Sequence, residues 1–181
     1  MTSWTDEFPA LIEEALERSN RPDSRDHGVH HWQLVAVVGA ELIPLVPGAD
    51  LEIVFCFALF HDSKRENEYV DPGHGKRGGQ LAAELLEGRG LLGDEQLEKL
   101  VYACHHHTGA RTSEDPTIGA CWDSDRLNLW RVAIEPDPKF MSTSPGHDPA
   151  RIKWAEDLQD EHYTWAQICE MYSTLEGGPQ V

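Results

Sequence analysis

A histidine and an aspartate, His61 and Asp62, directly follow the most apolar run in the chain, residues 51–60. Polar side chains at the end of a buried segment cost free energy unless they share a partner. Neutral imidazole and carboxylate are both ordinary ligands of divalent metal ions, so one cation would satisfy the pair. The alternative is a helix cap or a hydrogen-bonded couple, which is the commoner meaning of an isolated His-Asp pair. The pair is therefore a candidate metal site that needs support from other residues.

Further histidines lie near the ends of expected helices. His27 and His31 are four residues apart, so both can project from one helical face if that helix begins early. His74 opens a glycine-rich segment, and glycines that lower helix stability indicate close approach of another helix or a ligand. Three consecutive histidines, residues 105–107, end another expected helix. We expect His27 and His30 to face solvent or to lie just outside a ligand set.

Two aspartates, Asp123 and Asp125, are separated by a single residue. On a helix this spacing is a rotation of roughly 200°, so one of them should face the interior and the other should not. Asp125 shares its face with Ile118, Trp122 and Leu129. We therefore expect Asp125 to point inward.

In chain order, His31, His61, Asp62 and Asp125 resemble the H…HD…D signature of the HD-domain metal-dependent phosphohydrolase superfamily. The resemblance covers about residues 25–135. It includes the segment His-Trp-Gln-Leu-Val that begins at His31 and the tripeptide Asp-Arg-Leu that begins at Asp125. It implies a helical bundle in which the four residues hold one divalent ion.

The segment His74-Gly75-x-x-Gly78 and a histidine at the end of the next helix resemble the additional ligands of two-metal members. The resemblance implies a second ion held by His74 and His107, with Asp62 bridging the two ions. An apolar-x-x-His spacing favours His107, and the two histidines before it, His105 and His106, remain alternative ligands.

Two such ions would activate a water molecule and neutralise charge on a phosphoryl group. Asp62 would bridge or orient that water, and Lys64, Arg65 or Arg126 would contact the phosphate. We expect a phosphomonoesterase or phosphodiesterase that acts on a small phosphate ester, such as a nucleotide or related metabolite. The metal is left open among manganese, iron, magnesium, cobalt, nickel and zinc. A di-iron oxygenase of the HD-domain type and a non-enzymatic metal- or nucleotide-binding regulatory protein are the alternative functions.

Composition excludes other classes of partner. The 15 basic and 32 acidic residues give a net charge of −17, which repels nucleic-acid backbones. The apolar stretch 35–60 is interrupted by prolines and acids, so we expect no membrane span, and the N-terminus has no signal-peptide pattern. We expect a cytoplasmic protein whose four cysteines, which show no C-x-x-C spacing, are buried thiols. The oligomeric state is not readable from the sequence.

The elements that must position these residues are helices. Apolar residues recur with helical spacing throughout, and no strand alternation is present. The sequence predicts an all-α, compact bundle of about six to eight helices that forms a single domain over residues 1–181. Residues 136–149 carry four prolines and read as an irregular excursion that, with the loop at 108–115, would contribute to the pocket walls. The expected helices cover about residues 6–19, 29–42, 51–61, 74–87, 94–107, 116–129 and 149–175.

Overall fold

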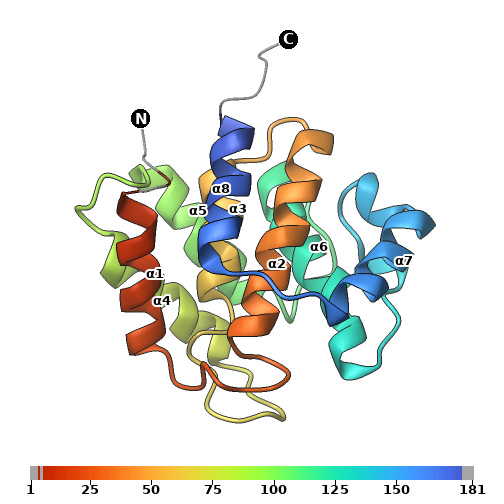
Figure 1. Ribbon diagram of the computed structural model, residues 1–181, viewed down its shortest axis with the longest axis horizontal. Coiled ribbons are helices and arrows are strands. Elements are labelled where there is room, and N and C mark those ends of the chain that lie inside the picture. Colours follow the sequence, from red (N-terminus) through yellow and green to blue (C-terminus); the bar gives the residue numbers. More distant parts are fainter. Residues whose placement is uncertain (1–3, 5, 177–181) are drawn as a thin grey trace.

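The computed structural model describes residue 4 and residues 6–176 (Figure 1). Within these residues the chain is a bundle of eight α-helices with several short 3-10 turns and no strand. The all-α prediction is therefore confirmed. The helices are α1 (Glu7–Arg18), α2 (Val29–Leu42), α3 (Leu51–Phe60), α4 (His74–Leu86), α5 (Asp94–His106), α6 (Pro116–Arg126), α7 (Pro149–Asp157) and α8 (Trp165–Glu176).

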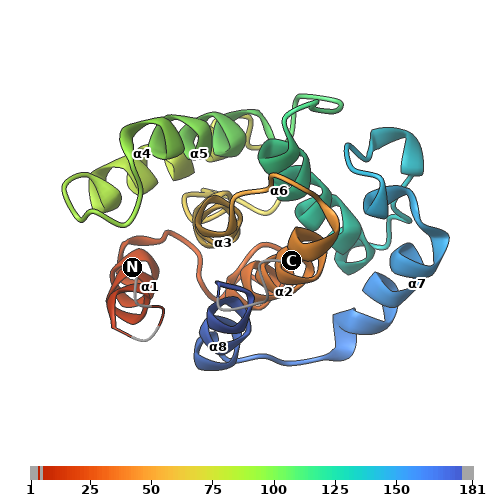
Figure 2. The same ribbon diagram turned by 90° about the horizontal axis from the view of Figure 1, so that it is seen from above.

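Helix α3 is the central element, and Figure 2 shows most of the other helices arranged around it, with α7 lying outside, beyond α2 and α6. Its residues 53–60 are all buried, which is the pattern of a helix that is apolar on every side. Asp50 caps its N-terminus, because the Asp50 carboxylate accepts a hydrogen bond of 3.0 Å from the Ile53 N–H. The helix ends at Phe60, directly before His61.

Two glycines of α4 allow that helix to lie unusually close to its neighbours. A Cβ atom on Gly75 would lie 2.2 Å from the Cys104 carbonyl oxygen of α5. A Cβ atom on Gly78 would lie 2.2 Å from the Phe60 carbonyl oxygen at the end of α3. No side chain fits at such distances, so the predicted close approach of a neighbouring helix is confirmed.

The helix directions bring five helix ends to one end of the bundle. The N-terminal ends of α2 and α4 meet the C-terminal ends of α3, α5 and α6 there, below the centre of Figure 1. The partial negative charge of the three helix C-termini is largely offset by the partial positive charge of the two N-termini.

The single helix predicted over residues 149–175 is wrong. Helix α7 ends at Asp157, and α8 begins at Trp165 after a 3-10 turn and an extended segment. Thr164 and Gln167 form a reciprocal capping box: the Thr164 N–H donates to the Gln167 side chain (2.8 Å), and the Gln167 N–H donates to the Thr164 hydroxyl (3.3 Å). The Thr-x-x-Gln pattern that starts α8 was present in the sequence, so this boundary could have been predicted.

The described residues allow two expectations to be compared with the structure, namely buried free cysteines and no membrane-spanning helix. All four cysteines are free and buried, as predicted. Burial raises the pKa of the Cys104 thiol well above its usual range and that of Cys169 to about 11, so both stay protonated near neutral pH. None of the described helices has the length and apolarity that a membrane crossing requires.

Candidate metal centre

The six predicted ligands converge at the end of the bundle where the five helix ends meet. His31 lies in the first turn of α2 and His74 at the start of α4, while His61 and Asp62 follow α3 directly. His107 follows α5, and Asp125 lies at the end of α6. The structure therefore brings together residues that are up to 94 positions apart. All six side chains are shielded from solvent, with Asp125 the most exposed at 13%.

One group of donor atoms is formed by His31, His61 and the two aspartates. The Nε2 atom of His31 lies 3.1 Å from Nε2 of His61 and 3.2 Å from Oδ1 of Asp125. Oδ2 of Asp62 lies 3.7 Å from the Nε2 atoms of both His31 and His61. Asp125 therefore faces the cluster, as expected. We call this group the first centre.

A second group of donor atoms uses the other oxygen of the same aspartate. Oδ1 of Asp62 lies 3.1 Å from Nε2 of His74 and 3.8 Å from Nε2 of His107. The two histidine Nε2 atoms lie 3.0 Å apart. Asp62 thus presents one carboxylate oxygen to each group, which is the arrangement of a bridging ligand. We call His74, His107 and Asp62 Oδ1 the second centre.

Backbone carbonyls determine which ring nitrogen carries the proton. A carbonyl oxygen can only accept, so each Nδ1 that faces one must be the N–H, and the Nε2 atom of a neutral ring is then a lone pair. Three rings meet this condition, and all three direct Nε2 toward the cluster. Their Nδ1 atoms donate to these carbonyl oxygens: His61 to Phe57 at 3.1 Å, His107 to Cys104 at 2.7 Å, and His74 to Asp71.

The donor set fits two divalent cations. When both rings are neutral, the Nε2 lone pairs of His74 and His107 face each other at 3.0 Å and repel. Among the described residues, Asp62 Oδ1 and Asp125 Oδ1 are buried without a hydrogen-bond partner. Leaving buried carboxylate oxygens unsatisfied is costly. A cation in each centre would satisfy these oxygens and separate the lone pairs, so these buried groups could hold metal ions.

The protonation states also suit metal binding. Burial lowers the pKa of His31 to about 3 and that of His107 to about 4, so both rings are neutral near pH 7. Burial raises the pKa of Asp62, but His61 and its neighbours pull it well below the usual range. Burial also raises the pKa of Asp125, and the stronger combined effect of His31 and nearby cations lowers it. Metal ligands need this combination of neutral imidazole and ionised carboxylate.

A cavity of about 250 Å³ opens onto both centres. Arg65 and Arg131 line it, and each directs one N–H group toward a ligand carboxylate: Arg65 Nη1 lies 3.6 Å from Asp62 Oδ1, and Arg131 Nη2 lies 3.7 Å from Asp125 Oδ1. The cavity therefore combines metal ligands with fixed positive charge. Its lining residues are His27, Asp62, Arg65, His74, His107, Thr108, Asp125, Arg126, Leu129 and Arg131.

Arg131 was not predicted from the sequence, and Thr108 was predicted only as part of the 108–115 loop that would line the pocket. Arg131 is held by hydrogen bonds from its Nε to the Asp26 carbonyl and from its Nη1 to the Asn128 carbonyl. The Thr108 hydroxyl lies 3.4 Å from Nε2 of His74. Thr108 directly follows His107, so its place beside the ligand was a signal available in the sequence. Arg131 lies in a 3-10 turn after α6, and no spacing rule relates it to Asp125.

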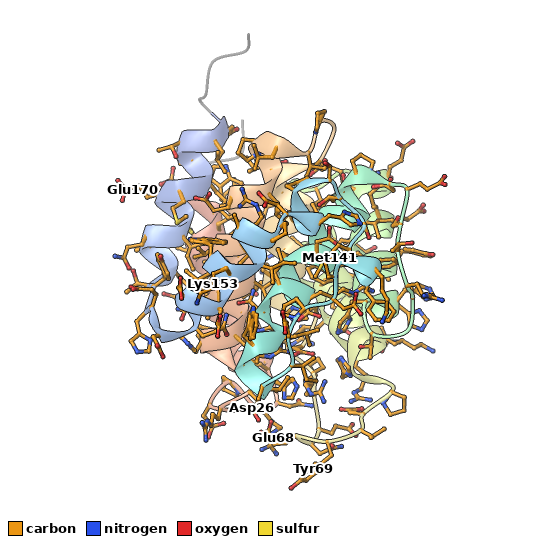
Figure 3. All side chains as sticks on the ribbon, turned by 90° about the vertical axis from the view of Figure 1, so that its right-hand side faces the viewer. Asp26, Glu68, Tyr69, Met141, Lys153 and Glu170 are labelled. Atoms are coloured by element: carbon orange, nitrogen blue, oxygen red, sulfur yellow. The ribbon has the colours of Figure 1, made fainter. Side chains whose placement is uncertain are left out.

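His27 also reaches the cavity wall, from the turn before α2. Its Nδ1 lies 3.1 Å from the Glu68 carboxylate, which also accepts from the Ser24 hydroxyl and the Arg21 guanidinium. Glu68 and the neighbouring Tyr69 lie on the loop between α3 and α4, at the lower edge of Figure 3. These contacts tie that loop to the segment before α2, so the two walls of the cavity are joined.

The structure corrects two of the predicted phosphate-binding residues. The Lys64 ammonium donates to the Arg18 carbonyl at 2.8 Å, and Lys64 is not part of the cavity wall. Arg126 does line the cavity, but its guanidinium donates to the carbonyls of Ala110 (2.7 Å), Phe140 (2.6 Å) and Arg111. Because these bonds engage both terminal nitrogens of Arg126, its guanidinium positions the 108–111 loop. Of the three predicted cations, only Arg65 faces the centres.

Asp123 is the other correction. It was expected to turn away from the interior, but it is fully buried. Its carboxylate accepts from the Ser142 N–H, the Thr143 N–H and the Thr143 hydroxyl at 2.7–2.8 Å. The irregular segment that contains Met141 covers this face of α6 (Figure 3), so both faces of the helix are interior.

Comparison with known proteins adds no assignment. No family model matches the chain, and neither a curated protein nor a solved structure does. Functional assignment therefore depends on the geometry of the two centres and the cavity.

Proposed function

We propose that this protein is a metal-dependent phosphohydrolase that resembles the HD-domain superfamily and acts on a small phosphate ester. The observation that carries the proposal is the division of one carboxylate between two histidine pairs. Asp62 gives Oδ2 to the pair His31 and His61, and Oδ1 to the pair His74 and His107. Bound divalent ions in such a paired centre supply an activated water and stabilise charge on the phosphoryl oxygens.

The chain's own residues would bind and orient the ester. Arg65 and Arg131 each present an N–H group beside a ligand carboxylate in the cavity, where a phosphoryl group can accept from both. Two further N–H groups of each guanidinium donate to backbone carbonyls, so both arginine side chains are held in place before the substrate enters. Such pre-positioned donors lower the cost of binding in the reactive orientation.

A neighbouring cavity would hold the organic part of the substrate. It measures about 240 Å³ and shares Thr108, Arg126 and Leu129 with the first cavity. The Arg111 guanidinium lies over the ring of Phe140 at 5.5 Å on its wall. A cation stacked on an exposed aromatic ring suits a planar group such as a nucleobase, which supports a nucleotide or a related metabolite as the substrate.

A substrate screen tests the proposal. We expect the purified protein, loaded in turn with manganese, magnesium, cobalt, nickel, iron or zinc, to hydrolyse at least one phosphomonoester, phosphodiester or nucleotide. His61→Ala and Asp62→Ala should reduce the rate to background. Lys64→Gln is the matched control. It removes a positive charge close to His61 and Asp62 in the sequence, on a side chain that does not line the cavity. Hydrolysis that is unaffected by both ligand substitutions would refute the proposal.

The two arginines favour hydrolysis over the di-iron oxygenase alternative, because they suit an anionic substrate. The ligand set of four histidines and two carboxylates is nevertheless compatible with iron. Colour, iron content and oxygen consumption of protein reconstituted with iron distinguish the two activities. A nucleotide that binds tightly without turnover in any metal would instead indicate the regulatory alternative.

A further inference from the structure

Arg65 holds a fixed positive charge beside the second centre. Its side chain is 9% exposed, and its Nη2 donates to the Tyr69 carbonyl at 2.8 Å. Its Nη1 lies 3.3 Å from Nε2 and 3.4 Å from Nδ1 of His74, and 3.6 Å from Asp62 Oδ1. Near-equal distances to both ring nitrogens place Nη1 beside the imidazole and not on the axis of the Nε2 lone pair. Arg65 therefore leaves the Nε2 lone pair of His74 accessible to a metal ion, although its guanidinium lies next to the ligand atoms.

The two centres differ by one unit of charge. Both share Asp62. The first centre adds the carboxylate of Asp125, which the nearby Arg131 offsets. The second centre adds only the imidazole rings of His74 and His107, so it has no second carboxylate to offset the charge of Arg65.

We propose that Arg65 makes binding of a divalent ion at the second centre depend on an anion. A guanidinium stays protonated at any ordinary pH, so its repulsion of a neighbouring divalent ion is permanent. A phosphate oxygen that accepts from Arg65 Nη1 offsets this charge and can also ligate the ion. By reciprocity of binding free energies, the ion at the second centre must then strengthen phosphate binding by the same factor. The inference rests on the proposed metal and phosphate binding. It adds that the first centre binds its ion first and that the second centre binds its ion together with the anion.

Manganese binding provides the test, measured by isothermal titration calorimetry and by metal content after equilibrium dialysis. For the wild-type chain we expect one tight ion and one weaker ion, and inorganic phosphate should tighten the weaker ion by about tenfold. Arg65→Gln should tighten the second ion by about tenfold without phosphate and should remove most of the phosphate effect. Lys64→Gln removes the same charge one residue earlier, on a side chain bound to the Arg18 carbonyl, and should match the wild type.

Arg65→Lys keeps the charge while it removes the bond to the loop carbonyl, so it should retain the weak second ion and the response to phosphate. The phosphate effect on the wild type is informative even if neither variant folds. Two ions of equal affinity with no phosphate effect, or an Arg65→Gln variant whose second ion is unchanged or weaker, would overturn the inference. Absence of any manganese binding would overturn the proposed function as well. Anion-dependent filling without hydrolysis of any ester would refute only the proposed activity.

Discussion

The Nε2 atoms of His74 and His107 lie 3.0 Å apart, while the Nδ1 proton of each ring is donated to a backbone carbonyl. Two ring lone pairs at this distance favour a cation between them. The arrangement also distinguishes His107 from the two histidines before it. His106 packs against Tyr102 in a tilted arrangement and lines a different pocket, away from the cluster.

Substitution of His107 should therefore change the metal stoichiometry. We expect His107→Ala to reduce the manganese content from two ions to one, because only the second centre loses a nitrogen ligand. His106→Ala is the matched control and should keep both ions. Metal content measured by mass spectrometry after equilibrium dialysis against manganese and phosphate checks this prediction. Loss of an ion from the His106 variant, and not from the His107 variant, would show that the ligand lies elsewhere in the triple histidine.

Metal removal should reverse the effect of a ligand substitution on stability. An ion that binds only the folded state at about 100 times its dissociation constant adds about 2.7 kcal/mol to the free energy of unfolding. For a chain of this size that is a rise in Tm of roughly 5–10 °C. With excess manganese, the wild type should thus melt above His74→Leu. In chelator, His74→Leu should melt at the same temperature as the wild type or higher, because it removes a repelling lone pair.

Thermal unfolding followed by circular dichroism, with and without chelator, measures this reversal. A His74→Leu protein that is less stable than the wild type under both conditions would mean that His74 contributes through packing alone.

Gly78 should be intolerant of any side chain. Its Cβ would meet the Phe60 carbonyl oxygen at 2.2 Å, so Gly78→Ala must push α4 away from α3. We expect a loss of about 1–3 kcal/mol in the free energy of unfolding. Gly109→Ala is the control, because no atom lies within 4 Å of a Cβ there, and it should be neutral or slightly stabilising. Chemical denaturation of the two variants gives both values, and equal stability would contradict the close approach.

The Glu68 contacts should stabilise the protein in a pH-dependent manner. Partial burial raises the pKa of Glu68, but hydrogen bonds from His27, Ser24 and Arg21 outweigh it and lower the pKa to about 2. A depressed carboxyl pKa stabilises the folded state above the unfolded pKa of about 4.3, and this is lost as pH falls toward 2. Glu68→Gln should therefore be less stable than the wild type at pH 7, by at most about 1 kcal/mol because the group is partly exposed.

Urea denaturation between pH 7 and pH 3 follows that difference. It should shrink as the pH falls, because the wild-type carboxylate becomes protonated in the unfolded state first. A difference that stays constant across this range would mean that the charge of Glu68 does not matter.

Most helix boundaries were predictable because their causes are local. The starts of α3 at Leu51 and of α6 at Pro116 depend on residues within one turn, and both lie where predicted. The break between α7 and α8 was local too, in the Thr164 and Gln167 capping box, but the apolar periodicity on either side concealed it. The candidate ligand histidines were selected for a related reason, because their chemical type and their order along the chain can be compared with a family signature without knowledge of the fold.

By itself, the sequence determined the all-helical architecture and the set of residues able to ligate metal, because helix formation and ligand chemistry depend on residue type and short spacings. Only the tertiary structure decided which cations face the centres. Lys64 and Arg65 are adjacent in sequence, yet one binds the Arg18 carbonyl and the other lies beside His74. Arg131 and the buried Asp123 depend on contacts with residues more than 15 positions away. Such contacts are set by how loops return to the bundle, which no local spacing encodes.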